Sequence, residues 1–316
     1  MLVTVTLNAA IDKTYRLSHF RSGELHRTGD VLSLPGGKGI NVARVAKALG
    51  QDVVASGFVA GHNGRFIAEG CEREGITSSF IETRGESRLC LAFLDEQEKT
   101  VTEVLEQGLS PSEEEISRLQ TRLIELADQA QYMVFSGSLP GGVPTETYAA
   151  LVRGVAGKGT GTACVLDTSG QALLEGIKAT PSLIKPNRPE AEAILGFSLD
   201  SDEARCRAIR ELRERGAQRV LLSLGEEGAW FGDGQETWRI SAIPLADAEV
   251  KNTVGCGDSM LAGVLVGKLR GLAWPDSIWL GMACGAANTR SFGAGMIELD
   301  DVQQLRSQPM HVERVE

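Results

Sequence analysis

The residues with the clearest chemical potential lie in one short segment, Asn252-Thr253-Val254-Gly255-Cys256-Gly257-Asp258-Ser259. An apolar run of small residues, Met260–Val266, follows it, so the pattern predicts a turn that opens a helix. The Gly255–Gly257 turn would then present unpaired backbone N–H groups, an arrangement that binds anions. Asp258 would lie in the first helical turn, where the helix dipole stabilises a carboxylate. A carboxylate beside an anion hole suits deprotonation of an alcohol that attacks a phosphoryl group, although a plain helix start with an aspartate cap has the same sequence.

A second glycine-rich segment lies near the N-terminus, Pro35-Gly36-Gly37-Lys38-Gly39-Ile40-Asn41-Val42-Ala43. Two adjacent glycines let the backbone approach a ligand closely. Lys38 and Asn41, at the start of the following helix, offer donors for hydroxyl or phosphate oxygens. The segment is not a P-loop, because no Gly-x-x-x-x-Gly-Lys-Ser/Thr pattern occurs in the chain. A glycine-rich turn before a helix is common, so this signal alone is weak.

The composition sets the class of protein that carries these segments. The chain has 316 residues, of which 42% are hydrophobic and 23% are charged, as in ordinary globular proteins. Its 32 Lys and Arg against 42 Asp and Glu give a net charge of −10, which argues against a nucleic acid partner. No apolar stretch is long enough for a membrane span, and Met1–Asn8 predicts a first strand rather than a signal peptide. Six scattered cysteines and four unclustered histidines predict neither disulfides nor a zinc site, and they favour the reducing cytoplasm.

Short apolar runs alternate with amphipathic segments along the chain. Such runs are typical of parallel strands buried on both faces, and the alternation predicts a doubly wound α/β sheet. A helix is expected over Asn41–Leu49, and another is expected to begin at Ser110-Pro111 with Glu113 closing a capping box. The candidate strands are Leu2–Leu7, Val53–Phe58, Tyr132–Ser136, Ala163–Asp167, Ser182–Lys185 and Val220–Leu224.

Two segments depart from this alternation and predict a small second sheet. Residues 11–35 show period-2 patterning without a good helix. Arg88–Leu94 and Thr100–Leu105, on either side of Asp95-Glu96-Gln97-Glu98, predict an antiparallel hairpin. No linker or repeat divides the chain, so we expect residues 1–316 to form one domain whose lid comprises about 11–35 and 88–105.

At this point the sequence resembles a known family. The segments Gly36–Ala43 and Val254–Ser259 are similar to the two signatures of the PfkB-type sugar kinases, in the ribokinase superfamily. Three further stretches between them, and the opening Thr4–Asp12, also fit, so the resemblance covers nearly the whole chain. The three stretches are Phe135-Ser136-Gly137-Ser138-Leu139-Pro140-Gly141-Gly142, Ile184-Lys185-Pro186-Asn187-Arg188-Pro189-Glu190 and Leu222-Ser223-Leu224-Gly225-Glu226-Glu227-Gly228. The resemblance implies a ribokinase-like fold and an ATP-dependent kinase.

The resemblance also implies roles for individual residues. Asp258 matches the catalytic base, and the backbone of Gly255, Cys256 and Gly257 matches the anion hole. Asn187 and Glu190 match an Asn-x-x-Glu pair that organises Mg²⁺, for which carboxylate and amide ligands are suited. Positions that hold the sugar match Asp12, Gly37, Lys38 and Asn41, and positions near ATP match Lys185, Ser223, Gly225, Gly228 and Asn288. Ala9 and Cys256 depart from the family pattern, but both are small and remove no chemical group; Cys256 is either a thiol sensitive to oxidation or an inert buried one.

The form of the first signature narrows the choice of substrate, because it most resembles that of the 1-phosphofructokinase and tagatose-6-phosphate kinase group. These enzymes phosphorylate a hexose that already carries a phosphate. Lys38 and Arg88 are the candidate cations for that phosphate, and we expect both to face the pocket unpaired, although Arg88 could be a solvated strand end. Fructose 1-phosphate is the favoured acceptor, while Thr102–Gly108 leans toward the tagatose-type relatives.

Two other functions are compared with this one. A non-catalytic sensor of sugar phosphates or nucleotides could use the same fold, but it has no need for Asp258. A dinucleotide-dependent dehydrogenase is suggested by Gly57, Gly61 and Gly64, whose spacing does not match Gly-x-Gly-x-x-Gly. The resemblance further implies a homodimer in which the uncovered face of the lid meets a second subunit.

Overall fold

A ten-stranded sheet forms the centre of the structure, a computed structural model that describes residues 1–246 and 249–315. Neighbouring strands pair in parallel from β11 to β5, and the three strands at the other end pair antiparallel. In spatial order the strands are β14 (Val312–Arg314), β13 (Thr237–Ile240), β12 (Ala229–Gly232), β11 (Val220–Ser223), β10 (Leu183–Ile184), β9 (Ala163–Asp167), β8 (Tyr132–Ser136), β1 (Leu2–Thr6), β4 (Val53–Val59) and β5 (Thr77–Glu82). The expected doubly wound, mostly parallel sheet is confirmed.

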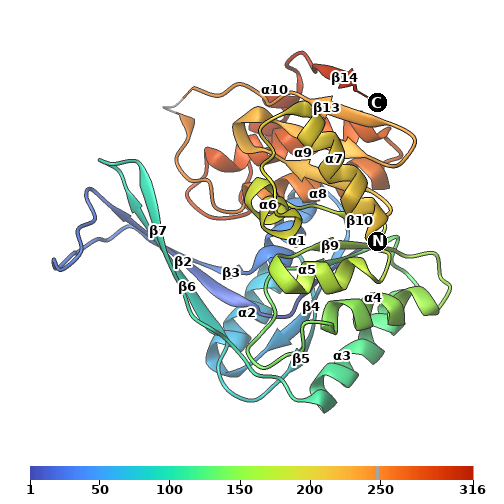
Figure 1. Cartoon of the computed structure of the whole chain (residues 1–316). Helices are drawn as coiled ribbons and strands as arrows, with labels where there is room; N and C mark the ends of the chain where they lie inside the picture. Colours follow the sequence, from blue (N-terminus) through green and yellow to red (C-terminus); the bar gives the residue numbers. More distant parts are fainter. Residues whose placement is uncertain (247–248, 316) are drawn as a thin grey trace.

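Helices cover both faces of this sheet (Figure 1). One face packs against α1 (Lys38–Ala48), α2 (Gly61–Arg73), α8 (Cys256–Leu269), α9 (Trp274–Thr289) and α10 (Leu299–Arg306). The other packs against α3 (Glu113–Leu126), α4 (Thr147–Gly157), α5 (Gly170–Ile177), α6 (Arg188–Leu195) and α7 (Asp202–Glu214). Because successive strand side chains point to opposite faces, Leu2 joins the first core and Val3 the second. None of the helices within the described residues has the length and apolarity needed to cross a membrane.

A separate four-stranded sheet projects from the body and is called the lid sheet below (Figure 1). It contains β3 (Val31–Gly36), β2 (Ala10–Leu17), β6 (Arg88–Asp95) and β7 (Thr100–Leu105), in that order. The expected hairpin is present as the antiparallel pair β6–β7. Strand β2 pairs in parallel with β6, so the two segments that departed from the alternation form one sheet.

Some local expectations were wrong. The capping box of α3 is formed by Ser112 and Glu115, not by Ser110 and Glu113. The serine side chain accepts from the Glu115 backbone N–H, and the Glu115 side chain accepts from the Ser112 N–H. Helix α1 begins at Lys38, three residues earlier than Asn41, because Gly37 (φ 106°) makes the turn that allows it. Strands β5, β12, β13 and β14, which include both edges of the main sheet, were not among the predicted strands.

Candidate active site

The site residues meet where the parallel strands of the main sheet end, which is where open α/β sheets bind ligands. Asp167 is the last residue of β9, and Lys185 directly follows β10. Lys38 begins α1, and Asp258 lies in the first turn of α8. Four elements from distant parts of the chain therefore bring charged side chains to one edge.

Asp258 is a buried carboxylic acid, with 6% of its surface exposed. Its Oδ2 accepts a hydrogen bond of 2.9 Å from the side-chain nitrogen of Asn41. Burial raises the pKa of Asp258 to about 7, with Asp167 adding to the rise while Lys38, Asn41 and Lys185 oppose it. A carboxyl group with this pKa can accept a proton near neutral pH.

The turn before Asp258 depends on a glycine at its first position. Gly255 is the N-cap of α8 and has φ 83°, a left-handed conformation. A Cβ at Gly255 would lie 2.7 Å from the backbone nitrogen of Gly295, so the position is also sterically closed. Lys185 Nζ lies 3.3 Å from the place that a Cβ of Gly257 would occupy. The helix N-terminus and a lysine, 3% exposed, thus make one positive site beside Asp258.

Asp167 is a fully buried carboxylate between two lysines, and the sequence analysis missed it. Its Oδ1 lies 3.2 Å from Lys38 Nζ and its Oδ2 lies 3.3 Å from Lys185 Nζ. Burial raises the pKa of Asp167, but the two ammonium groups outweigh burial and hold it below its usual value. Its place at the end of a predicted buried strand was the available signal, since a carboxylate there faces the ligand edge.

Lys38 is paired, contrary to the expectation of an unpaired cation facing the pocket. Its ammonium contacts Asp167 and, at 3.5 Å, Glu190 Oε1. The Asp167 carboxylate, helped by Asp258 and Glu190, holds the pKa of Lys38 above its usual value despite burial. Lys38 therefore belongs to the charged cluster at the sheet edge.

Asn187 and Glu190 form a capping box at the start of α6. Asn187 Oδ1 accepts from the Glu190 N–H at 2.8 Å, and Glu190 Oε2 accepts from the Asn187 N–H at 2.9 Å. Within residues 1–246 and 249–315 no three His, Cys, Asp or Glu side chains are grouped to hold a metal. The donors present fit Mg²⁺, because this ion commonly takes one or two carboxylates and completes its shell with water and substrate phosphates. Glu190 and Asp167 are two carboxylates at this edge of the sheet, and both contact Lys38.

The predicted nucleotide segment forms a tight turn, η1 (Gly225–Glu227), after β11. Gly225 and Gly228 have φ 60° and 92°, and a Cβ at Gly228 would meet Ile240 O at 2.2 Å. Ser223 forms a parallel bridge with Asn187 and donates its backbone N–H to Pro186 O at 3.0 Å. The turn and the Asn-x-x-Glu segment therefore lie side by side.

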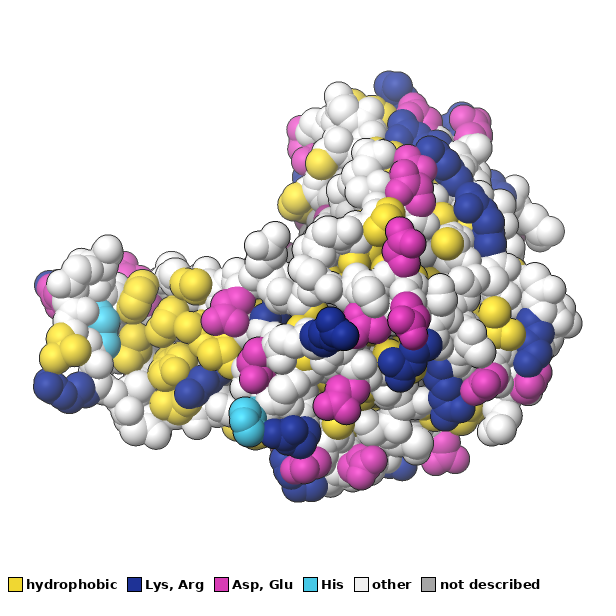
Figure 2. All heavy atoms as spheres, turned by 90° about the horizontal axis from the view of Figure 1, so that it is seen from below, with side chains coloured by type: hydrophobic (Ala, Val, Ile, Leu, Met, Phe, Trp, Pro, Cys, Tyr) yellow, Lys and Arg dark blue, Asp and Glu magenta, His cyan; other side chains and the backbone are white. Residues whose placement is uncertain are grey.

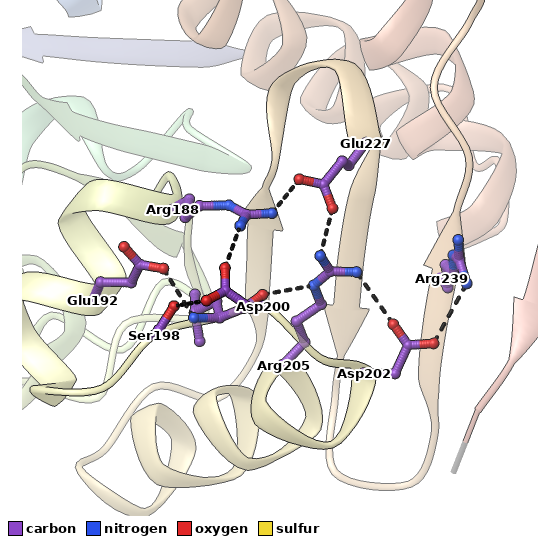
Figure 3. Close-up of polar contacts among 9 residues, drawn as sticks. Arg188, Glu192, Ser198, Asp200, Asp202, Arg205, Glu227 and Arg239 are labelled. Atoms are coloured by element: carbon purple, nitrogen blue, oxygen red, sulfur yellow. Dashed lines mark hydrogen bonds and ion pairs between the residues drawn. The ribbon is translucent and has the colours of Figure 1, made fainter.

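A network of ion pairs supports this turn (Figure 3). Glu227 accepts hydrogen bonds from Arg188, the first residue of α6, and from Arg205 on α7. Arg205 also contacts Asp202 at 3.1 Å, and Arg239 on β13 contacts Asp202 at 3.4 Å. Because Arg205 is almost buried, this network links the turn to α6 and α7 more firmly than exposed pairs would.

Asn288 has a different role from the one the resemblance implied. It is 0% exposed, so it has no surface to offer a nucleotide. Its amide nitrogen donates to Val254 O at 2.9 Å, and its oxygen accepts from Ser259 Oγ at 3.2 Å. Asn288 also donates to Cys256 Sγ at 3.3 Å, and burial raises the pKa of Cys256 to about 11, as for an inert thiol. From α9, Asn288 thus stabilises the Gly255–Asp258 turn through contacts with Val254, Cys256 and Ser259.

The candidate sugar residues lie where the lid sheet joins the body. Gly37 donates its N–H to Asp12 Oδ2 at 3.4 Å, and burial raises the pKa of Asp12. Arg88 is anchored by two backbone carbonyls, because its Nε donates to Asn8 O at 3.2 Å and its Nη1 to Glu106 O at 3.1 Å. Both acceptors are neutral, so these contacts leave the positive charge of the guanidinium uncompensated. Arg88 thereby ties the lid sheet to the end of β1, next to Asp12 on the neighbouring strand.

Known proteins resemble this chain over nearly its whole length. A sequence profile described as "pfkB family carbohydrate kinase" matches residues 5–300. A tagatose-6-phosphate kinase of Staphylococcus epidermidis is 33% identical over 317 residues, covering 98% of each chain. A Thermotoga maritima structure described as a "possible 1-phosphofructokinase" has a TM-score of 0.90 at 26% identity, covering 100% of this chain and 99% of that one. The tetrameric inhibited form of Escherichia coli phosphofructokinase-2 has a TM-score of 0.86 at 26% identity, covering 97% and 98%.

The substitution Asp258→Asn is expected to stabilise the fold more at high pH than at low pH. Burial raises the folded-state pKa to about 7 from 3.8, so the cost of ionising Asp258 is absent near pH 4 and complete above pH 7. Each pKa unit corresponds to about 1.4 kcal/mol of free energy. The substitution should therefore raise the free energy of unfolding by ~1–3 kcal/mol more at about pH 8 than at about pH 5.5. Urea denaturation at both pH values measures this difference.

Asp167→Asn is the matched control, because its pKa is lowered rather than raised. Its carboxylate stabilises the fold once ionised, above the usual pKa of 3.8. Its loss should therefore destabilise the protein at both pH values. An equal effect of Asp258→Asn at both would contradict the assignment of a raised pKa.

Proposed function

The chain belongs to the pfkB family of carbohydrate kinases, and from this we propose that it transfers the γ-phosphoryl group of ATP to a hydroxyl of a hexose monophosphate. The observation that carries the proposal is Asp258. It is buried, has a pKa raised to about 7, and lies at the mouth of the positive Gly255–Gly257 turn. A sensor would gain nothing from a base in this place.

In the proposed reaction the sugar hydroxyl oxygen attacks the γ-phosphorus, and the bond from that phosphorus to the bridging oxygen of ADP breaks. Asp258 takes the hydroxyl proton as the new O–P bond forms. The backbone N–H groups of the Gly255–Gly257 turn, together with Lys185, stabilise the charge on the transferring group. Lys38 adds a second ammonium at the same edge of the sheet.

ATP is proposed to lie over the turn after β11, with its phosphates toward the Asn187–Glu190 segment. Ser223, Gly225 and Gly228 line that turn, where the left-handed glycines let backbone approach the nucleotide. Glu190, with Asn187 as its capping partner, and Asp167 would hold Mg²⁺ through water. When bound, Mg²⁺ neutralises phosphate charge during transfer.

Two acceptors are in question. Fructose 1-phosphate is favoured by the form of the first signature, and the name of the Thermotoga maritima neighbour points the same way. Tagatose 6-phosphate is favoured by Thr102–Gly108 and by the name of the 33% identical relative. In either case Asp12, Gly37, Asn41 and Arg88, at the junction with the lid sheet, are proposed to hold the sugar phosphate.

We also propose that the lid sheet pairs with a second copy of this chain. Tyr15 and Phe93 stack with ring centroids 5.3 Å apart, and Phe20 stacks on Phe93 at 5.1 Å. These rings line a hollow in the lid sheet together with Leu17. Figure 2 shows the hydrophobic side chains gathered on the projecting arm. A thin sheet with an uncovered apolar face is marginally stable alone, so a partner copy would stabilise it.

Asp258→Asn is expected to lower kcat at least a hundredfold while nucleotide binding remains, since general-base catalysis contributes ~10²–10⁴-fold. In the wild type, kcat/KM should rise with pH through an inflection near 7, because only the ionised carboxylate accepts the proton. Steady-state ADP release measures both. Asp276→Asn, at the third residue of α9 as Asp258 is of α8, is the control and should leave kcat unchanged. Near-wild-type turnover of Asp258→Asn would overturn the proposed function.

A coupled ADP-release screen over hexoses, hexose monophosphates and nucleosides identifies the acceptor. Fructose 1-phosphate should be used far better than free fructose, and tagatose 6-phosphate should exceed both if the alternative holds. A charge-assisted hydrogen bond contributes ~1.5–3 kcal/mol, so Arg88→Ala should weaken the sugar phosphate at least about tenfold with the KM for ATP unchanged. Arg84→Ala, nearby but exposed, is the control. Better use of free hexoses or nucleosides would contradict the phosphate contact, and binding without ADP release would indicate a sensor.

Phe93→Asp is expected to convert a dimer into a monomer, because it places a charge in the aromatic stack of the lid sheet. Leu299→Asp removes an exposed hydrophobic side chain at the start of α10 and should leave the dimer intact. Analytical ultracentrifugation at micromolar concentration distinguishes the two. A wild-type protein that sediments only as a 33.8 kDa species would contradict the pairing.

A further inference from the structure

Arg44 is a buried arginine on α1 that no motif singled out. About a tenth of its side chain is exposed, and its guanidinium contacts four groups from different parts of the chain. Nε donates to Glu74 Oε2 at 2.7 Å, Nη1 donates to Asn41 Oδ1 and to Ala294 O, both at 3.1 Å, and Nη2 donates to Pro35 O at 2.5 Å. A buried guanidinium satisfied in this way holds its partners in fixed positions, because each lost contact would leave a buried polar group unpaired.

The contact with Asn41 determines which end of its amide faces Asp258. Arg44 donates to the amide oxygen, so the amide nitrogen remains for Asp258 and donates to Oδ2 at 2.9 Å. With the amide turned over, its oxygen would face the carboxylate oxygen, and Arg44 would face an N–H donor. Both contacts would then be repulsive, so the guanidinium fixes a single orientation.

The contact with Ala294 reaches the turn that precedes Asp258. A Cβ on Gly255 would lie 3.1 Å from both Cα and Cβ of Ala294, so the two segments pack closely. Gly295 packs equally closely against Asn41, since its Cβ would lie 3.0 Å from Asn41 Cα. One guanidinium therefore fixes the amide that touches Asp258 and the segment behind the anion-binding turn.

We propose that Arg44 is a positioning residue for the base of this kinase, acting through the Asn41 amide that donates to Asp258. The proposal rests on the proposed function of Asp258. Arg44 does not contact the reacting atoms itself. Its contact with Pro35, beside Gly36 and Gly37, extends the same anchoring to the base of the lid sheet.

The pH profile is the readout that a purely structural role would not move. The charged groups facing Asp258 are Lys38 on α1, Asp167 at the end of β9 and Lys185 after β10, and Asn41 contributes a neutral donor. Loss of that donor leaves the three charges in place, but it destabilises the ionised form of Asp258 relative to the protonated form. The inflection in kcat/KM should therefore move to higher pH, by about half a unit to one unit.

The experiment compares Arg44→Met, Arg44→Lys, Asn41→Ala and the double variant Arg44→Lys/Asn41→Ala, with urea denaturation of each. Arg44→Met and Asn41→Ala should each lower kcat about tenfold or more and raise the inflection, because small displacements of a catalytic group are costly. The KM for ATP should stay unchanged. Arg44→Lys keeps a charge, but its single nitrogen cannot reach all four acceptors of the guanidinium, so it should show the same shift. The double variant should be no worse than Asn41→Ala.

Glu74→Gln is the control, because it removes the ion pair on the far side of the same guanidinium. It should lower the free energy of unfolding without moving the inflection. Arg44 variants that lose stability but keep kcat and the inflection would overturn the proposal, as would additive effects of Arg44→Lys and Asn41→Ala. If Arg44→Met does not fold, Arg44→Lys and the double variant Arg44→Lys/Asn41→Ala still test the proposal. A failure of the proposed function would be recognised separately, because Asp258→Asn would then keep near-wild-type turnover.

Discussion

The buried contact of Asp167 with Lys38 and Lys185 is the interaction on which the rest of the site depends. An ionised carboxylate with no exposure is costly to bury unless cations accompany it, and here each oxygen faces one ammonium. Those ammonium groups come from the start of α1 and the end of β10. Pairing them with the end of β9 fixes three elements around the mouth of α8.

Burial among charges that already balance one another explains why Asp258 has a pKa near neutrality. Asp167 and Glu190 supply two negative charges, and Lys38 and Lys185 supply two positive charges, so the cluster is balanced while Asp258 is protonated. Ionising Asp258 in a buried place adds an uncompensated negative charge, which burial makes costly. Anionic phosphates entering the same edge would compete for the lysines, whereas loss of the hydroxyl proton to Asp258 restores neutrality there. Burial, opposed only in part by the two lysines, therefore gives this carboxyl the pKa that its proposed role as base requires.

The periodicity of apolar residues in the sequence predicts most of the fold, whereas the sequence predicts the candidate site only in part. Parallel strands buried on both faces give near-continuous apolar runs, so the six predicted strands lie at nearly the expected residues. The exposed edge strands β5 and β14 lack such runs and were missed. Asp167 was missed because its role comes from two lysines 129 residues before it and 18 residues after it, a juxtaposition that only the sheet order creates. Asn288 and Lys38 were misjudged for the same reason: a residue type and a motif position do not say which groups are near.

The residues proposed for catalysis and those proposed for acceptor choice lie in two parts of the molecule. The proposed base, the anion-binding turn and the lysines lie on the edge of the main sheet and on α1 and α8. Helix α8 in turn packs tightly against α9 through glycines, since a Cβ on Gly263 would lie 2.6 Å from Gly281 Cα. The residues proposed for the sugar lie instead where the lid sheet joins the body, and Arg88 reaches backbone carbonyls on both sides of that junction. The motifs shared with the family lie mostly in the part that holds the proposed base and the lysines. Close packing there leaves little room for substitutions. On the proposed function, differences among acceptors are therefore expected to come from the lid sheet, where side chains on β6 and β7 can change without disturbing the buried charges. This is why the sequence defines the reaction more sharply than the sugar.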